Sequence, residues 1–170
     1  MAFTFKVEDG TGFSDSNSYV SVEEADTYLE IDIHEQTWPA LDDSVKEKLL
    51  AMATREIDQK VVFKGEKTVD ESALSFPRSC VKHPDGTPVE VDEIPTAVRQ
   101  ATIELARTLA SGPSRDPNAT QGLEEIEVDV IRLKFTDGQI NSLPATVQRL
   151  LRQYGQTQTD KPSFAKIRRS

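Results

Sequence analysis

The sequence predicts a mainly α fold: a four-helix body with a long central loop and a small β-strand or hairpin element. Three observations predict it. Apolar residues recur at helical spacing in four separate stretches. A long segment rich in proline and other turn-forming residues separates the second stretch from the third, and one later stretch alternates as a strand does. We expect one domain over residues 1–155 and a flexible basic tail over 156–170.

The first residues predict a strand and a loop. Residues 3–7 alternate apolar and polar side chains, as a short strand does. Residues 8–18 are turn-forming throughout. They resemble a phosphate loop or a calcium loop only superficially, because the further glycine and the late glutamate of those motifs are missing. We expect a surface loop.

Two helices follow. Ser21 and Glu24 have the spacing of a capping box, which predicts a helix start at Ser21. Its apolar stripe extends toward Ile33, and the helix should end before Pro39. A second helix is predicted to begin near Ser44 and to end by Gly65. Its expected buried stripe consists of Val45, Leu49, Met52, Ala53 and Ile57, which Leu50 broadens.

The central segment, residues 66–93, is too long for a simple turn and is punctuated by prolines and by the turn signature Pro84-Asp85-Gly86. Loops of this length are usually functional or disordered. A third helix is predicted to begin at Pro95 and to end at Gly112. Its expected buried stripe consists of Val98, Ala101, Thr102, Leu105 and Leu109.

Residues 125–136 form the β segment. Its apolar residues alternate with acidic ones and then change phase, which suggests a bulge or a bend between two strands. Such a pair is marginal alone, so we expect it to pair with residues 3–7 or with a neighbouring subunit. The candidate inter-subunit residues are Ile126, Val128, Val130, Leu133 and Phe135. A short last helix is predicted to begin at Leu143-Pro144 and to end at Gly155.

The residues favour no catalytic, metal or cofactor site. Cys80 and His83 are three residues apart, but nothing else supports a nucleophile-base pair, and a buried or idle thiol is the better interpretation. His34-Glu35 lacks the second histidine of a zinc protease, since Trp38 stands in its place. We therefore expect no enzyme and no cofactor.

The formal net charge of -9 argues against tight, non-specific binding to a phosphate backbone. The tail differs from the rest of the chain, because no acid follows Asp160. Two interpretations remain open: a solvated end, or a peptide that docks on an acidic partner. The candidate docking residues are Lys161, Phe164, Lys166, Ile167, Arg168 and Arg169.

Cellular location follows from what the sequence lacks. The apolar runs are too short to span a membrane, and the N-terminus has no signal-peptide pattern. The single cysteine excludes an internal disulfide. We expect synthesis in the cytoplasm and no contact with a membrane.

Three pieces of the chain look familiar. Residues 7–29 (VEDGTGFSDSNSYVSVEEADTYL), 76–89 (FPRSCVKHPDGTPV) and 94–106 (IPTAVRQATIELA) resemble a family of tailed-bacteriophage proteins. These proteins are often labelled DnaT-like single-strand-DNA-binding proteins, and they also look like head-to-tail connector (adaptor) proteins. The resemblance covers roughly residues 7–155.

The connector resemblance implies a structural virion protein at the head-tail junction, made in the host cytoplasm. It implies a homo-oligomeric ring, typically of twelve copies, that binds the portal protein and a downstream tail, nozzle or head-completion protein. Genomic double-stranded DNA would pass through the ring without tight binding, because an acidic channel repels phosphate. The tail residues named above would dock on the portal.

The alternative is a single-stranded-DNA-binding accessory protein of replication, as the family label says. That function requires a basic groove with aromatic side chains for stacking. The acidic composition and the apparent core positions of the aromatic residues favour the connector over this alternative.

Overall fold

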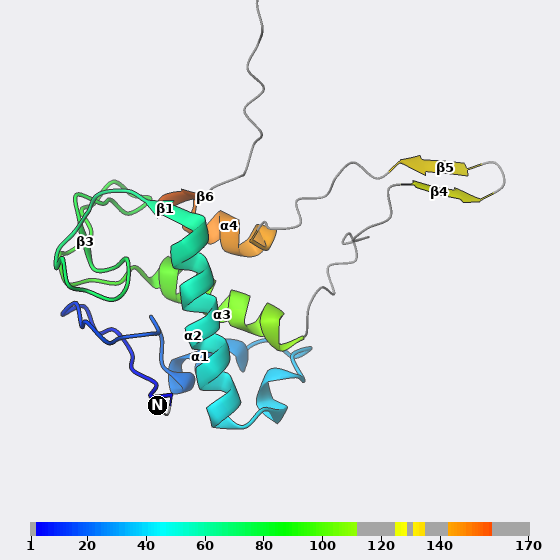
Figure 1. The fold of residues 1–170 in the computed structure, drawn as a ribbon, viewed down its shortest axis with the longest axis horizontal. Coiled ribbons are helices and arrows are strands. Elements are labelled where there is room, and N and C mark those ends of the chain that lie inside the picture. Colours follow the sequence, from blue (N-terminus) through cyan, green and yellow to red (C-terminus); the bar gives the residue numbers. More distant parts are fainter. Residues whose placement is uncertain (1–2, 112–124, 129–130, 135–142, 158–170) are drawn as a thin grey trace, which may run out of the picture.

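Helix α2 runs through the middle of the fold in the computed structural model and packs against α1, α3 and β1 (Figure 1). The structure describes residues 3–111, 125–128, 131–134 and 143–157. In chain order the elements are α1 (Val22–Leu29), the 3-10 helix η1 (Trp38–Ala40), α2 (Asp43–Lys60), β1 (Val61–Phe63), β2 (Glu66–Lys67), β3 (Arg78–Ser79), α3 (Thr96–Ala110), β4 (Glu125–Val128), β5 (Ile131–Lys134), α4 (Ala145–Leu151) and β6 (Gly155–Thr157).

Helices dominate these residues, so the predicted mainly α class is confirmed. The strands form three small antiparallel pairs, β1 with β6, β2 with β3, and β4 with β5. Helix α3 packs against α2 and α4 packs against α3, while β6 returns to pair with β1 at the end of α2. A connector fold is not shown by this arrangement.

The core lies between α2, α3 and α4 and extends into the central segment. Its largest fully buried side chains are Trp38, Tyr19, Phe76, Leu50, Ile57, Ile103, Leu105, Leu143, Leu151, Val20, Val98 and Val147. Trp38 is therefore a core residue. The N-cap prediction at Ser21 is also confirmed, since its hydroxyl accepts a 3.1 Å hydrogen bond from the Glu24 amide.

The predicted strand at residues 3–7 is wrong. Only Val7 forms a bridge, a parallel one to Ser18. The Asn17 side chain takes the place of a strand partner: its Oδ1 accepts from the Lys6 amide at 3.0 Å, and its amide nitrogen donates to the Thr4 carbonyl at 2.7 Å. A side chain thus satisfies the backbone groups that a neighbouring strand would otherwise pair.

Helix α1 ends at Leu29, earlier than its apolar stripe predicted, and leaves Ile31 and Ile33 more than four-fifths exposed. Arg107 on α3 holds the chain that follows. Its guanidinium donates to Asp32 at 2.8 Å and to Glu104 at 2.7 Å. The Arg107–Asp32 ion pair ties the chain after α1 to α3.

The predicted buried stripe of α2 is only partly correct, because the face that the helix buries is rotated about the helix axis from the predicted one. Ala53 and Ile57 are buried as expected, whereas Val45 and Met52 are exposed. The residues buried on α2 are Lys46, Leu50, Ala53, Thr54 and Ile57. Lys46 replaces an apolar residue because its ammonium donates to Asp26 at 2.9 Å.

The central segment is part of the core. Its residues Leu74, Phe76, Val81 and Val89 are buried. Short pairings organise it, including β2 with β3 and a bridge from Lys82 to Pro88. The turn-forming residues predicted the irregular backbone of this segment. The periodicity of the sequence did not reveal its buried residues, because they are not regularly spaced.

The β segment consists of two strands that pair with each other. Ile126 lies opposite Leu133, and Val128 lies opposite Ile131. The phase change therefore separates two strands, as the sequence suggested. Pairing with a neighbouring copy stays a prediction, and Val130 and Phe135 lie outside the described residues.

Candidate nucleic-acid interface

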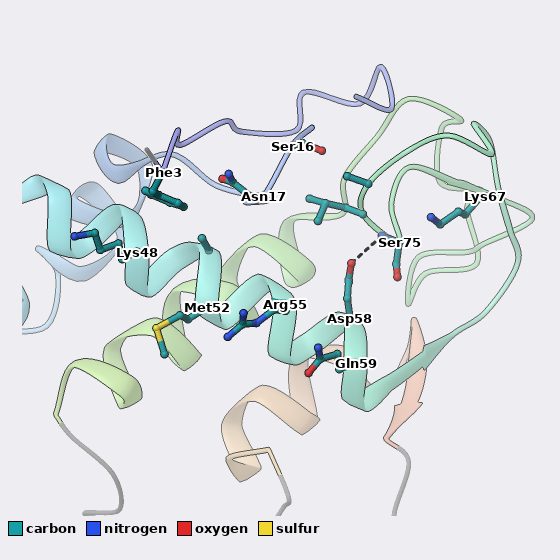
Figure 2. A pocket seen from close by; sticks show the side chains of 13 residues that line it. Phe3, Ser16, Asn17, Lys48, Met52, Arg55, Asp58, Gln59, Lys67 and Ser75 are labelled. Carbon is teal, nitrogen blue, oxygen red and sulfur yellow. Dashed lines mark hydrogen bonds between the residues drawn. The ribbon is translucent and has the colours of Figure 1, made fainter. Parts of the chain in front are cut away.

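A groove of about 660 Å³ lies along the exposed face of α2. Lys48, Met52, Arg55 and Gln59 follow one another along this face (Figure 2). They recur at intervals of three or four residues, which places them on one side of a helix. The rotation of α2 that buries Leu50 is the reason why this row faces solvent.

Two segments distant in sequence form the walls of the groove. Phe3, Ser16 and Asn17 lie on one side, and Lys67 and residues 73–75 lie on the other. The Ala73 amide donates to the Phe13 carbonyl at 2.9 Å and joins the two walls. We call this site, with α2 as its floor, the α2 groove.

A buried carboxylate shapes the first wall. Glu8 is 2% exposed. Its oxygens accept from the amides of Gly10 at 3.1 Å, Gly12 at 2.7 Å and Phe13 at 2.9 Å, and from the Ser16 hydroxyl at 2.8 Å. Residues 8–18 are therefore more than a surface loop. Their amides already bind an anion, which belongs to the chain itself.

A polar cluster fixes the second wall against α2. Asp58 accepts from the Tyr19 hydroxyl at 2.6 Å and from the Ser75 amide at 2.9 Å. The same hydroxyl accepts from the amides of Ser75 and Phe76. Burial raises the pKa of Asp58, and burial followed by the nearby Asp58 charge raises the pKa of Tyr19 well above its usual value.

The charge of the groove is positive. Lys48, Arg55 and Lys67 are exposed and form no ion pair among the described residues. Lys67 donates to the Ser72 carbonyl at 2.9 Å, and a carbonyl leaves the net charge of the ammonium unchanged. Asp58 is the one acidic residue in the lining, and donors occupy both its oxygens.

Two side chains add exposed apolar surface to these charges. Phe3 is 47% exposed and Met52 is 46% exposed. Phe3 projects from the N-terminal segment over the same stretch of α2 that carries Lys48 and Met52 (Figure 2). The site thus combines cations, an aromatic ring and a thioether in one open channel.

The pairs that the sequence considered and set aside have structural roles. His83 lies 3.2 Å from the Tyr154 hydroxyl through Nδ1 and 3.4 Å from Glu93 through Nε2, so its ring joins the central segment to the C-terminal part. Cys80 is exposed, so of the two interpretations, a buried or an idle thiol, burial does not hold. Glu35 accepts from the amide of Trp38 at 2.9 Å.

The predicted docking residues of the tail, from Lys161 to Arg169, lie outside the described residues, so their role stays a prediction. Within the described part of the chain, His, Cys, Asp and Glu side chains form no group of three that could hold a metal ion. No helix in that part has the length and apolar character needed to cross a membrane.

Comparison with known proteins identifies the family. A family model described as "Putative DnaT-like ssDNA binding protein" matches residues 3–170. The chain belongs to this family. The match covers both walls and the floor of the α2 groove, as well as the predicted tail. No curated protein and no solved structure matches this DnaT-like chain.

The family match contradicts the connector prediction. The sequence favoured a head-to-tail adaptor that forms a dodecameric ring around a DNA channel. The description of the matched family instead names single-stranded DNA binding. The acidic composition and the apparent core positions of the aromatic residues favoured the connector, but a net charge of -9 says nothing about where unpaired cations gather, and Phe3 is 47% exposed. The portal and tail partners and the virion location stay predictions that the match does not support.

Sequence reasoning missed the α2 groove. Its lining comes from residues 3–17, 48–59 and 67–75, and no single stretch carries the pattern. One local signal was present: Lys48, Met52 and Arg55 lie on one helical face. The helical spacing placed Met52 in the predicted buried stripe, so Met52 was not grouped with Lys48 and Arg55.

Proposed function

We propose that this DnaT-like protein binds single-stranded DNA in the α2 groove. The observation that carries the proposal is the lining itself. Three cations without acidic partners, Lys48, Arg55 and Lys67, line the same groove as the half-exposed Phe3 and Met52. Cations along the backbone with aromatic surface for the bases are the combination that single-strand-binding sites use.

The cations are placed to contact successive phosphates. Lys48 and Arg55 are seven residues apart on α2, which corresponds to about 10 Å along the helix axis. Phosphates of one strand are about 3.4 Å apart in a helical stack and farther apart when the strand is extended. The helix therefore spans a few nucleotides, and Lys67 on the far wall marks the end of the groove.

The apolar side chains favour a single strand over a duplex. Phe3 can stack only on a base whose face is free, and the bases of a duplex are covered by their neighbours. Met52 offers a further soft, polarisable contact within the groove. Phosphate contacts alone would not distinguish the two forms, so this preference depends on Phe3.

The acidic composition is compatible with such a site because the excess of acids lies outside the groove. The lining holds Lys48, Arg55 and Lys67 and the single acid Asp58. The overall charge still weakens long-range attraction. We therefore expect modest affinity that falls steeply with salt.

The test is fluorescence anisotropy of a labelled oligothymidine titrated with protein at several salt concentrations. For three phosphate contacts, log K should fall against log salt with a slope of about -2. K48Q, R55Q and K67Q should each weaken binding and reduce the slope by about 0.7. K82Q is the matched control, since Lys82 is exposed and lies outside the groove lining.

Two results would count against the proposal. Wild-type protein that binds neither the oligothymidine nor a mixed-sequence single strand at low salt would overturn it. Equal losses in K82Q and the three groove variants would show that binding depends on overall charge and not on the α2 groove.

A further inference from the structure

The second group of exposed cations lies beyond the end of the α2 groove, at the C-terminal end of α2. Arg149 and Arg152 are exposed on and just after α4, and Lys64 is exposed after β1. None of the three forms an ion pair among the described residues. Residues 143–157 contain no acid, in a chain whose net charge is -9.

Direct contacts connect this group to the groove. Lys67, at the groove end, lies opposite Arg78 in the β2–β3 pair. Arg78 donates to the Lys64 carbonyl at 2.8 Å and to the Gly65 carbonyl at 2.6 Å. Like charges opposite each other disfavour strand pairing, so the Lys67–Arg78 pair costs stability and concentrates positive charge.

The connection continues to α4. The Lys64 ammonium donates to the Gln153 carbonyl at 2.8 Å, and Gln153 follows Arg152 directly. Arg149 lies three residues before Arg152, so both share one side of the α4 region. Glu66 is the acid nearest to this route in sequence, and strand alternation directs its side chain to the face opposite Lys67.

We infer that the bound single strand leaves the α2 groove past Lys67 and continues over Lys64 to Arg152 and Arg149. This inference rests on the proposed function of the groove and names a longer ligand for it. Arg78 acts as a support and not as a contact, because carbonyl oxygens occupy its guanidinium and burial lowers its pKa.

The inference has a quantitative consequence for ligand length. A strand of about 6 nucleotides can occupy the groove alone, while one of about 20 nucleotides can also reach α4. The short strand should give a salt slope of about -2, from three contacts. The long strand gains Lys64, Arg149 and Arg152 and should give about -4, from six contacts.

The experiment compares wild type, R149Q/R152Q and R149K/R152K on both oligothymidines, with circular dichroism as a check on folding. We expect R149Q/R152Q to bind the short strand as wild type does and to bind the long strand with a slope about 1.4 less steep. R149K/R152K keeps both charges and should behave as wild type.

The outcomes separate the two proposals. If wild type binds both strands and R149Q/R152Q matches it on the long one, the path ends in the groove and this inference is overturned while the groove function stands. Equal loss on the short and the long strand would also overturn it. Wild-type protein that binds neither strand would remove the proposed function and the extension together.

Discussion

The Tyr19 hydroxyl donates a 2.6 Å hydrogen bond to the Asp58 carboxylate, 39 residues further along the chain. Tyr19 is 1% exposed, and its hydroxyl also accepts from the Ser75 and Phe76 amides. One hydroxyl thus joins the residues before α1, the C-terminal turn of α2 and the central segment. These are also the segments that position the second wall of the α2 groove.

Tyr19→Phe should lower the free energy of unfolding by about 1–3 kcal/mol, because Asp58 and two backbone amides lose a buried partner. Urea denaturation followed by circular dichroism measures the change. Tyr28→Phe is the matched control: its hydroxyl donates to Glu104 at 3.2 Å at a partly exposed site. A loss in Tyr19→Phe no larger than in Tyr28→Phe would contradict this prediction.

Asp58 should make stability fall as pH rises. Burial raises its pKa in the folded protein above the unfolded value of 3.8, so the folded state binds the proton more tightly. Its contribution is complete below pH 3.8 and is lost as pH rises through the raised folded pKa. Wild type should therefore gain stability relative to Asp58→Asn as pH is lowered from 7 toward 4. If the free energies of unfolding of the two proteins change in parallel with pH, this prediction is wrong.

Arg107→Lys should loosen the chain between α1 and α2. The guanidinium contacts Asp32 and Glu104 at once, whereas an ammonium is a point charge that cannot reproduce this fork. Amide hydrogen exchange should quicken at residues 30–37 and stay unchanged in α4. Unaltered exchange at residues 30–37 would mean that Arg107 does not hold this segment.

Phe3→Ala should weaken single-strand binding by about 1–3 kcal/mol and leave any duplex binding unchanged, since only the single strand offers a base to stack. Anisotropy titrations with matched single-stranded and duplex probes measure both. Val91→Ala serves as control, because Val91 is 60% exposed and lies outside the groove lining. The same loss with both probes would argue against stacking.

The sequence predicted those parts of the fold that depend on local chemistry. The Ser21 cap was correct, and Val98, Ala101, Thr102 and Leu105 of the predicted α3 stripe are buried, while Leu109 is only partly buried. The buried face of α2 could not be predicted from local spacing. The spacing of Val45, Leu49 and Met52 is as helical as that of Lys46, Leu50 and Ala53, and only packing against the other helices selects one face.

The candidate site was harder to predict than the fold. The role of Glu8 requires knowing that Gly10 and Gly12 adopt positive φ angles of 102° and 78° and direct their amides inward. A Cβ on Gly10 would lie 1.7 Å from the Asp92 carbonyl oxygen, a contact with a residue far along the chain. Long-range contacts of this kind leave no periodic signal in the sequence.

The Glu8 carboxylate is a ligand tethered to its own receptor. Glu8→Ala would remove the ligand and leave the three amides and the Ser16 hydroxyl as an empty cradle of the size of a carboxylate. Formate or acetate added to the buffer could then fill it. The first wall of the α2 groove would become a chemically inducible element, assembled when the small anion is supplied and released when it is dialysed away.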